Sequence, residues 1–518
     1  MMSKSREVIL FGLVLFSLAA VTAHAWHPYF DCPDPVLPAA TRTVNVSNDT
    51  ELDAAIADMQ AGDHIVLADG TYDGINIENK NAGTEESPVV FVAENDRQAV
   101  VSGSHAGRNM RISNSSYLHV YGVRFTGADV WGVTVGPSYA GDDATLGNHH
   151  IRIQNCEIDN AHQELLTTSG NSHHIEFLCN ELHHSGRNLN GGAFAEGIYV
   201  GCGGTGDDRS HDVLIRGNHI HHIGRADNPG YGEAIDVKVQ TYNITIADNL
   251  IEHVTVHSQA AITVHVNDVD YPAGQENPNV LVMRNIVHDV RKCDDGWDGC
   301  GIWASANGVT ISNNIVWDTY RSSITGIQDA SNTVDSLRIY NNTCFDVVDG
   351  NRDCIALNTG DIYGDANPVR AVLLNNITDD GSGGNDFTAT AADFVGPITG
   401  DADAGEGAGS GFMLDSGSDA VDGGVAIATV SADITGTDRP QGEAHDMGAF
   451  EYAPPVLNSP ARNPRAHSVI VRATSGTSVY ALNGRLAGTT RGTFNSRMPS
   501  SSGMYVIVPG KPEKVLVK

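Results

Sequence analysis

Apolar and polar residues alternate in a short segment that recurs along much of the chain. This alternation is the period of a strand with one buried face. The copies begin at residues 173, 211, 242, 278, 307 and 335, and they read HHIEFLCNELHH, HDVLIRGNHIHH, YNITIADNLIEH, PNVLVMRNIVHD, NGVTISNNIVWD and DSLRIYNNTCFD. An Asn recurs at one place in the repeat, as Asn180, Asn218, Asn249, Asn285, Asn314, Asn342 and Asn376. We expect these amides to hydrogen-bond from coil to coil, and we interpret the pairs His183-His184 and His221-His222 as solvated turn residues.

A second recurring segment lies between these copies. Its third position is Val, Leu or Ile and its fifth is mostly apolar, as in WGVTVG (131–136), EGIYVG (196–201), EAIDVK (233–238) and AAITVH (260–265). Two short strands per turn, repeated every 25–40 residues, are typical of a parallel β-solenoid, in which each coil stacks on the one before. The pattern therefore predicts an all-β fold, a right-handed parallel β-helix, with coils from about residue 64 to about residue 380.

The ends of such a stack expose unpaired strand edges and need covers. Between Asp49 and Met59, the apolar residues Leu52 and Ile56 have helical spacing, and Asp49 or Thr50 can act as the N-cap. We therefore expect a helix that caps the first coil.

Composition and charge exclude one class of function and distinguish the C-terminal tail from the rest of the chain. Of 518 residues, 41% are hydrophobic, enough for a sizeable core. Lys plus Arg number 31 against 63 Asp plus Glu, a net charge of −32, which argues against nucleic-acid binding because that needs a basic surface. Residues 456–518 carry nine Lys or Arg and one Glu, so this tail is +8 and residues 1–455 are −40. A change of sign this sharp marks a separate module.

The N-terminus has the pattern of a secretory signal peptide. A charged start precedes an apolar run over residues 8–21, and Ala23-His24-Ala25 is a small-x-small cleavage site. No run is long enough for a comfortable membrane span, so we expect a secreted or cell-surface monomer without a transmembrane segment in its mature form. The predicted domains are a signal peptide (1–25), the capped β-helix (26–395), a trailing module (396–455) and a small C-terminal β-sandwich (456–518).

Export permits disulfide bonds between some of the eight cysteines. Cys293 and Cys300 are close enough in sequence to close a local loop, as are Cys344 and Cys354. Sequence spacing leaves the connectivity open.

The second segment also predicts where chemistry can lie. Because positions three and five point inward, positions four and six point outward on one face. Candidate catalytic residues at position six of adjacent coils are Lys238 and His265, and candidate Ca²⁺ ligands are Glu196, Glu233 and Asp236. Candidate substrate-binding residues are the aromatic Tyr199 and Trp303, which suit sugar rings, and Arg187, Arg225 and Arg321, which suit carboxylates.

Two stretches resemble known families. TELDAAIADMQAGDHIVLADGTYDG (50–74), followed by SPVVFVAEN and VVSGSH, resembles the opening of the chondroitinase B and alginate lyase family of β-helix polysaccharide lyases. That family carries a Glu-x-Ile-x-x-Lys strand, matched here by Glu233 to Lys238, in which Glu binds calcium and Lys is the catalytic base. It has Arg on the next coil, where this chain has His265. The tail, with SVYALNGRLAG and KVLVK, resembles sorting domains of type IX secretion substrates.

The first resemblance implies β-elimination on an acidic, uronate-containing polysaccharide. A neutral Lys238 would take the C5 proton, a cation would neutralise the adjacent carboxylate, and His265 or a loop Arg would assist the leaving O4 oxygen. One alternative is a glycoside hydrolase or C5-epimerase that uses Asp236 with Glu233 or Glu196. Another is a non-catalytic carbohydrate-binding adhesin, since a β-helix alone does not identify a function.

Overall fold

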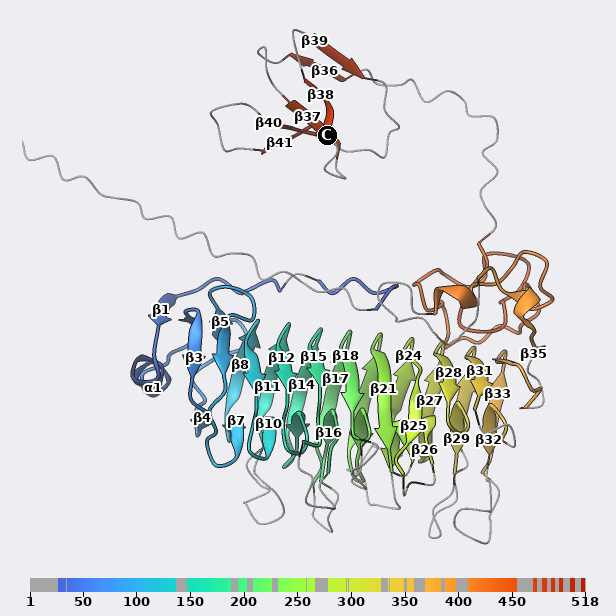
Figure 1. Cartoon of the computed structure of the whole chain (residues 1–518), viewed down its shortest axis with the longest axis horizontal. Coiled ribbons are helices and arrows are strands. Elements are labelled where there is room, and N and C mark those ends of the chain that lie inside the picture. Colours follow the sequence, from blue (N-terminus) through green and yellow to red (C-terminus); the bar gives the residue numbers. More distant parts are fainter. Residues whose placement is uncertain are drawn as a thin grey trace, which may run out of the picture. The chain divides into compact units, whose positions relative to one another are not determined.

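Three long parallel sheets run the length of the first of two compact units, Met1–Ala453 and Pro454–Lys518. The computed structural model describes residues 27–33, 35–136, 147–187, 194–202, 208–225, 232–257, 259–265, 278–294, 296, 298–327, 334, 336–348, 352–357, 369–382, 387–396 and 409–453, and the strands of the tail. Successive coils stack in chain order, with the predicted helix at one end (Figure 1). The architecture is the predicted right-handed parallel β-helix.

Sheet A takes one strand from each coil and contains the alternating halves of the first repeat. Its strands are β1 (Arg42–Val46), β2 (Asp63–Leu67), β5 (Val89–Ala93), β8 (Ser116–Tyr121), β11 (His149–Gln154), β14 (His173–Leu178), β17 (His211–Arg216), β20 (Tyr242–Ala247), β23 (Val280–Met283), β27 (Val309–Ser312), β30 (Leu337–Tyr340) and β33 (Ala371–Leu374).

Sheet B follows each strand of sheet A after a turn. Its strands are β3 (Gly70–Tyr72), β6 (Ala99–Val101), β9 (Arg124–Thr126), β12 (Glu157–Asp159), β15 (Glu181–His183), β18 (His219–Ile223), β21 (Leu250–Val256), β24 (Ile286–Val287), β25 (Val290–Lys292), β28 (Ile315–Thr319), β31 (Thr343–Val347), β34 (Ile377–Thr378) and β35 (Phe387–Thr388).

Sheet C contains the second repeat segment and therefore the candidate site. Its strands are β4 (Ile75–Glu78), β7 (Arg108–Ser113), β10 (Trp131–Val135), β13 (Leu166–Thr168), β16 (Ile198–Val200), β19 (Ile235–Val237), β22 (Ala260–His265), β26 (Cys300–Ser305), β29 (Ile324–Gly326) and β32 (Ile355–Leu357). Positions three and five of the segment are buried in the core between the sheets, as in Ile235 and Val237.

The turn from sheet A to sheet B has two residues in every coil from β11 onward. Its first residue has a left-handed backbone, with φ of 55° at Cys179 and 70° at Gly217. After β14 and every later strand of sheet A, its second residue is the repeated Asn, whereas Cys156 takes this place after β11. Each amide donates to the next one, with Nδ2 to Oδ1 distances of 3.0 Å from Asn180 to Asn218 and 2.9 Å from Asn249 to Asn285. The same bonds link the remaining pairs through Asn376, so the predicted ladder is confirmed.

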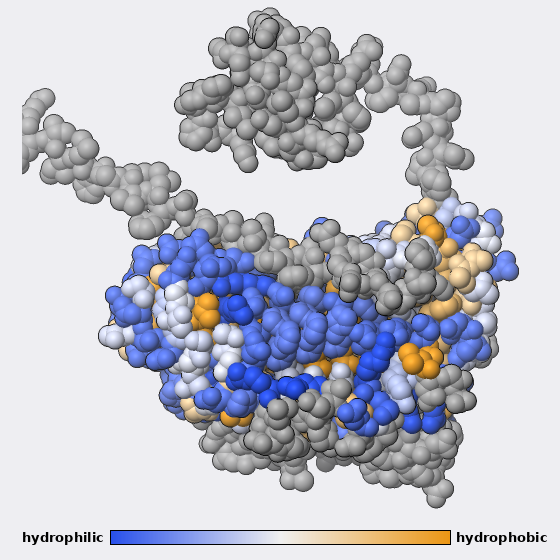
Figure 2. Space-filling model, viewed as in Figure 1, coloured by the Kyte–Doolittle hydropathy of each residue, from blue (hydrophilic) through white to orange (hydrophobic). Residues whose placement is uncertain are grey.

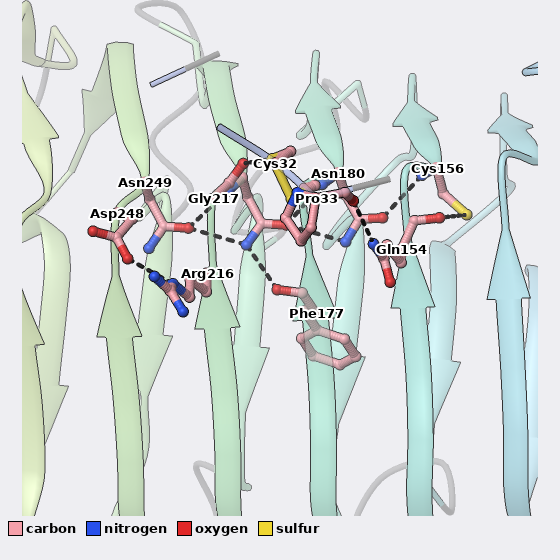
Figure 3. The surroundings of a disulfide bond; sticks show 12 residues. Cys32, Pro33, Gln154, Cys156, Phe177, Asn180, Arg216, Gly217, Asp248 and Asn249 are labelled. Carbon is pink, nitrogen blue, oxygen red and sulfur yellow. Dashed lines mark hydrogen bonds and ion pairs between the residues drawn. A yellow bond between two sulfur atoms is a disulfide. The ribbon is translucent and has the colours of Figure 1, made fainter. Parts of the chain in front are cut away.

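A disulfide attaches the N-terminal segment to this row of turns. Cys32 is bonded to Cys179, the left-handed turn residue beside Asn180 (Figure 3). The ring of Phe30 lies 4.2 Å from the Arg216 guanidinium carbon on the next coil. Local sequence spacing did not suggest this pairing, because the two cysteines are 147 residues apart.

The predicted helix is α1 (Asp49–Ala57), and its buried face packs Leu52 and Ile56 against the core of the first coils. Its N-cap is Asn48 instead of the predicted Asp49 or Thr50, because the Asn48 side chain accepts the Glu51 amide proton at 3.0 Å. The prediction was wrong by one residue, since all three types can cap a helix.

Residues 409–453 pack on the outer face of sheet B near its C-terminal end, through η2 (Ser410–Phe412) and irregular chain. An upstream 3₁₀ turn, η1 (Ala391–Asp393), precedes them. Arg439 and Glu451 form an ion pair at 2.9 Å with fully buried side chains, and Arg439 also donates to Asn313 Oδ1 at 3.2 Å. On the face drawn in Figure 2, hydrophilic side chains form a broad band along the coils, and hydrophobic residues gather toward this end.

The second unit, Pro454–Lys518, contains two antiparallel sheets. One pairs β36 (Val469–Arg472) with β39 (Thr493–Ser496), and the other contains β37 (Ser478–Ala481), β38 (Leu486–Thr489), β40 (Met504–Ile507) and β41 (Lys514–Val517). Within the described part of the chain, no helix has the length and apolar character needed to span a membrane. The predicted signal peptide lies outside the described residues.

Candidate functional site

On sheet C, equivalent positions of successive coils align in columns, as predicted. The register of β16, β19, β22 and β26 aligns Tyr199, Asp236, Thr263 and Trp303 at position four. Val237 pairs with Val264, so Lys238 and His265, which follow these two residues, lie on adjacent coils as predicted. The residues predicted to work together are therefore brought together by strand register.

Position one of the segment carries three glutamates on consecutive coils. The Glu164 carbonyl accepts the Gly132 amide proton, the Glu196 carbonyl accepts that of Leu165, and the Glu233 carbonyl accepts that of Gly197. This ladder stacks the three residues, and each is at most 3% exposed. Glu164 was not among the predicted site residues, although its place at position one was a usable signal.

The predicted cation ligands form a close group. Glu196, Glu233 and Asp236 each place one carboxylate oxygen within 4.8 Å of the other two. Both Glu196 oxygens and Glu233 Oε2 are buried and accept no hydrogen bond from the residues that the structure describes. Buried carboxylate oxygens without donors are energetically costly, and hard cations such as Ca²⁺ take several such ligands, so this group fits a cation.

Burial and mutual repulsion determine how these acids titrate. Burial, together with the Asp236 charge, raises the pKa of Glu233 from its usual 4.5 to about 8. Burial likewise raises the pKa of Glu164 to about 7. The pKa of Glu196 lies well above its usual value, because of burial and the charges of Glu164 and Glu233. Without a cation, the site therefore holds protons at neutral pH.

Lys238 and His265 are the parts of the cluster that reach solvent. Their side chains are 20% and 21% exposed, whereas Asp236 is fully buried beneath them. The Lys238 ammonium pairs with Asp236 and lies 5.2 Å from the centre of the Tyr199 ring. His265 Nε2 lies 3.8 Å from Asp236 Oδ1 and 3.0 Å from Gln259 Oε1. Asp236 thus lies between the two candidate catalytic groups.

The sequence left open whether Lys238 would be neutral. Burial alone lowers the pKa of Lys238, but Asp236 and Glu233 outweigh it, so the pKa lies above its usual value. Lys238 is therefore protonated in the cation-free site. A charge that offset the carboxylates would favour the neutral amine, because the same carboxylates raise its pKa.

A glycine keeps space beside Lys238. Gly201, after β16, has φ +94°, a backbone conformation that L side chains rarely adopt. A Cβ at this position would lie 2.7 Å from Thr241 Cγ2 and 3.3 Å from Lys238 Cβ. Gly at position six of this coil is therefore required by its backbone and by its neighbours.

Position four points outward as predicted, but its aromatic residues are covered by their neighbours. Tyr199 is 8% exposed and Trp303 is 2% exposed. Trp303 packs in a cluster with Ala260, Cys300 and Ile327. Alternation fixes the side of the sheet to which a residue points, but neighbours in the column and at its edges decide whether it is covered. A role for either ring in sugar binding stays a prediction.

The predicted arginines separate into two groups. Arg187 and Arg225 line a cavity of about 440 Å³, together with Arg291, His184, His222 and His253. None of the described residues around Lys238 contributes to that lining. Arg321 instead pairs with the buried Asp298 at 2.6 Å. Burial raises the pKa of Asp298, and the adjacent guanidinium opposes that shift.

The histidines expected to be solvated are partly buried. The side chains of His183 and His221 are each 14% exposed, and their rings stack 4.9 Å apart. They lie near Glu157 and Glu181 on sheet B, at 3.5 and 3.6 Å. The interpretation as solvated turn residues is therefore wrong for this column, because carboxylates of neighbouring strands surround it.

One family model and several solved structures are similar to this chain. The family model for chondroitinase B matches residues 46–185, and this match ends before Glu196 and the rest of the cluster. No curated protein matches the chain.

Solved structures similar to the chain include polysaccharide lyases and an epimerase. An alginate lyase from Paenibacillus sp. str. FPU-7 is 20% identical, with 58% of this chain and 96% of that one covered and a TM-score of 0.43. The pectate lyase Pel9A is 16% identical, with 80% and 97% covered and a TM-score of 0.47. The A-module of a mannuronan C-5 epimerase from Azotobacter vinelandii is 12% identical, with 65% and 86% covered and a TM-score of 0.42.

Proposed function

We propose that this chain is a secreted polysaccharide lyase that cleaves an acidic, uronate-containing polysaccharide by β-elimination. One observation carries the proposal: Lys238 and His265 reach solvent side by side above the buried carboxylates of Glu196, Glu233 and Asp236. Buried oxygens of Glu196 and Glu233 that lack donors among the described residues are a cost that a purely structural coil has no need to bear. The match of the N-terminal coils to the chondroitinase B model supports the same reaction class.

The roles of the residues follow from their positions. Lys238 is the candidate base that removes the proton at C5 of a uronate, because its amine is accessible on the sheet C surface. His265, on the adjacent coil, is the candidate acid that donates a proton to the leaving O4 oxygen. Asp236 orients Lys238 through their ion pair. Positioned proton transfer of this kind typically contributes 10²–10⁴ in rate.

The carboxylates are the candidate ligands of a divalent cation. Glu196, Glu233 and Asp236 would hold Ca²⁺, which would offset their charge and stabilise negative charge that develops beside the substrate carboxylate. The same oxygens argue against an inverting hydrolase. They approach within 4.8 Å, whereas an inverting pair is separated by roughly 6.5–9.5 Å to admit a water.

The overall negative charge of the chain does not prevent it from binding a polyuronate. Screening at physiological ionic strength confines repulsion to about 8 Å. Arg187, Arg225 and Arg291 around the cavity supply local positive charge. We propose export through the N-terminal signal and sorting through the basic tail, as the sequence predicts.

The test is a screen of the purified mature protein on pectate, alginate and glycosaminoglycans, with ultraviolet absorbance of the unsaturated uronate as the readout. Activity should depend on added Ca²⁺ and disappear in excess chelator. Lys238→Ala should lose about 10²–10⁴ of the turnover. Its melting temperature should fall, because the buried Asp236 carboxylate loses its ion-pair partner, so turnover is compared below the melting temperature of the variant. Lys292→Ala, in β25 on sheet B, is the matched control and should retain wild-type turnover.

Other results would redirect the proposal. Wild-type turnover by Lys238→Ala would exclude Lys238 as the base. Reducing sugar without ultraviolet absorbance would identify a hydrolase. Proton exchange at C5 without cleavage would identify an epimerase, and binding without any reaction would identify an adhesin.

A further inference from the structure

A cluster of histidines and carboxylates lies on the outer face of sheet B, and the proposed lyase site does not use it. In β15 and β18, Leu182 and Ile220 are buried in the core, so their neighbours point outward. The register pairs Glu181 with His219, and His221 lies two residues further along β18. Glu181, His219 and His221 are called the sheet B triad below.

The distances within the triad are those of a potential metal site. One ligand atom of each residue lies within 4.8 Å of the other two. His221 Nε2 is 3.6 Å from Glu181 Oε1, and the rings of His219 and His221 are 4.3 Å apart. The side chains are between 12% and 18% exposed, which keeps them partly desolvated yet reachable. Two imidazoles and one carboxylate are a ligand set of zinc sites that keep a fourth position open.

Neighbouring groups hold the triad in place. Glu252 Oε1 lies 2.8 Å from His219 Nε2, and a carboxylate on one ring nitrogen orients an imidazole and raises its basicity. Arg97 pairs with Glu181 Oε2, so the other oxygen, Oε1, faces His221.

The charge around the triad also suits a divalent cation. On this face, four carboxylates and two guanidinium groups add up to a formal charge of −2 when the histidines are neutral. These groups are Glu157, Asp159, Glu181 and Glu252, and Arg97 and Arg124. A second set, Glu157, Asp159 and His183, is equally compact. It is less suited, because Asp159 already pairs with Arg124 at 3.0 Å and accepts from Thr126 at 2.6 Å.

We propose that Glu181, His219 and His221 form a binding site for a divalent transition-metal ion of the Zn²⁺ type. The site is separate from the carboxylate group on sheet C. Nitrogen ligands favour Zn²⁺ on sheet B, whereas the all-oxygen group on sheet C favours Ca²⁺. The two ions can therefore be loaded independently.

The experiment measures Zn²⁺ binding by the metal-stripped full-length mature protein, using calorimetry in excess Ca²⁺ to occupy hard-cation sites. The wild type should bind one Zn²⁺ tightly. His221→Ala should weaken this binding at least tenfold. Glu252→Gln, which leaves the triad intact, should weaken it by about 10–100-fold through loss of orientation. His222→Ala, an exposed histidine beside the triad, is the matched control and should change the affinity less than twofold.

The outcomes separate the triad from general histidine binding. Equal losses in His221→Ala and His222→Ala, or several weak sites in place of one tight site, would overturn the proposal. A melting temperature recorded for each variant identifies loss of fold, and in that case the Glu252→Gln result decides. Lyase activity is not the readout, so failure of the proposed function leaves this test intact.

Discussion

Glu233 should make the stability of this protein fall as the pH rises, and Glu233→Gln should remove that dependence. The pKa of Glu233 is about 8 in the folded chain against 4.5 when unperturbed, with burial as the main cause. Because the folded value is raised, its contribution is complete below pH 4.5 and is lost as the pH rises toward 8. At 1.36 kcal/mol per pKa unit, the loss between pH 4.5 and pH 7 is about 3 kcal/mol.

Thermal melts in chelator measure this effect. With an unfolding entropy of about 2.1 cal/mol/K per residue over about 400 residues, 3 kcal/mol corresponds to about 4 °C. The melting temperature of Glu233→Gln minus that of wild type should therefore grow by about 4 °C between pH 4.5 and pH 7. Glu78→Gln, an exposed glutamate in β4 of the same sheet, is the control and should follow wild type.

The second part of the experiment measures the same melting temperatures with added Ca²⁺. A cation that binds only the folded chain raises its stability by mass action, so Ca²⁺ at pH 7 should raise the melting temperature of wild type and not that of Glu233→Gln. If the melting temperatures of wild type and Glu233→Gln change equally with pH, the prediction is refuted, because the pKa of Glu233 is then not raised in the folded chain. An equal response of both proteins to Ca²⁺ would place the cation elsewhere.

Three further predictions concern stability, each measured by denaturant unfolding. Asn249→Ala should cost about 3 kcal/mol or more, since it leaves buried partners in two adjacent coils unpaired; a loss below about 1 kcal/mol would show that the ladder is dispensable. Cys32→Ser should cost up to about 5 kcal/mol, because the disulfide closes a loop of 147 residues, and reductant should have no effect on the variant. Glu451→Gln should cost about 3–5 kcal/mol by leaving the Arg439 charge buried without its partner, and wild-type stability would contradict this.

Periodicity predicted the parts of the structure that repeat. The inward positions of sheet C, the Asn ladder and the adjacency of Lys238 and His265 all follow from counting residues within a coil. The compact group of Glu196, Glu233 and Asp236 follows as well, because register aligns equivalent positions.

Features that depend on contacts between different repeats could not be predicted in this way. Cys32 lies outside the repeat, so no spacing relates it to Cys179. The burial of Trp303 depends on side chains from three coils, and a period-2 pattern contains no information about them. The protonation of Lys238 depends on the distance to Asp236 and on burial, which only coordinates provide.

The constant two-residue turn between sheets A and B has a consequence for how this chain can change over evolutionary time. An insertion there would break the asparagine row and shift every later coil. By contrast, 14 residues separate β15 from β16 and only three separate β21 from β22. The loops from sheet B to sheet C therefore differ in length from coil to coil. We therefore expect insertions and deletions to be better tolerated beside the Lys238 cluster than in the turn that contains the asparagine ladder. Related chains can differ in the loops that border the Lys238 cluster while they keep the same asparagine ladder.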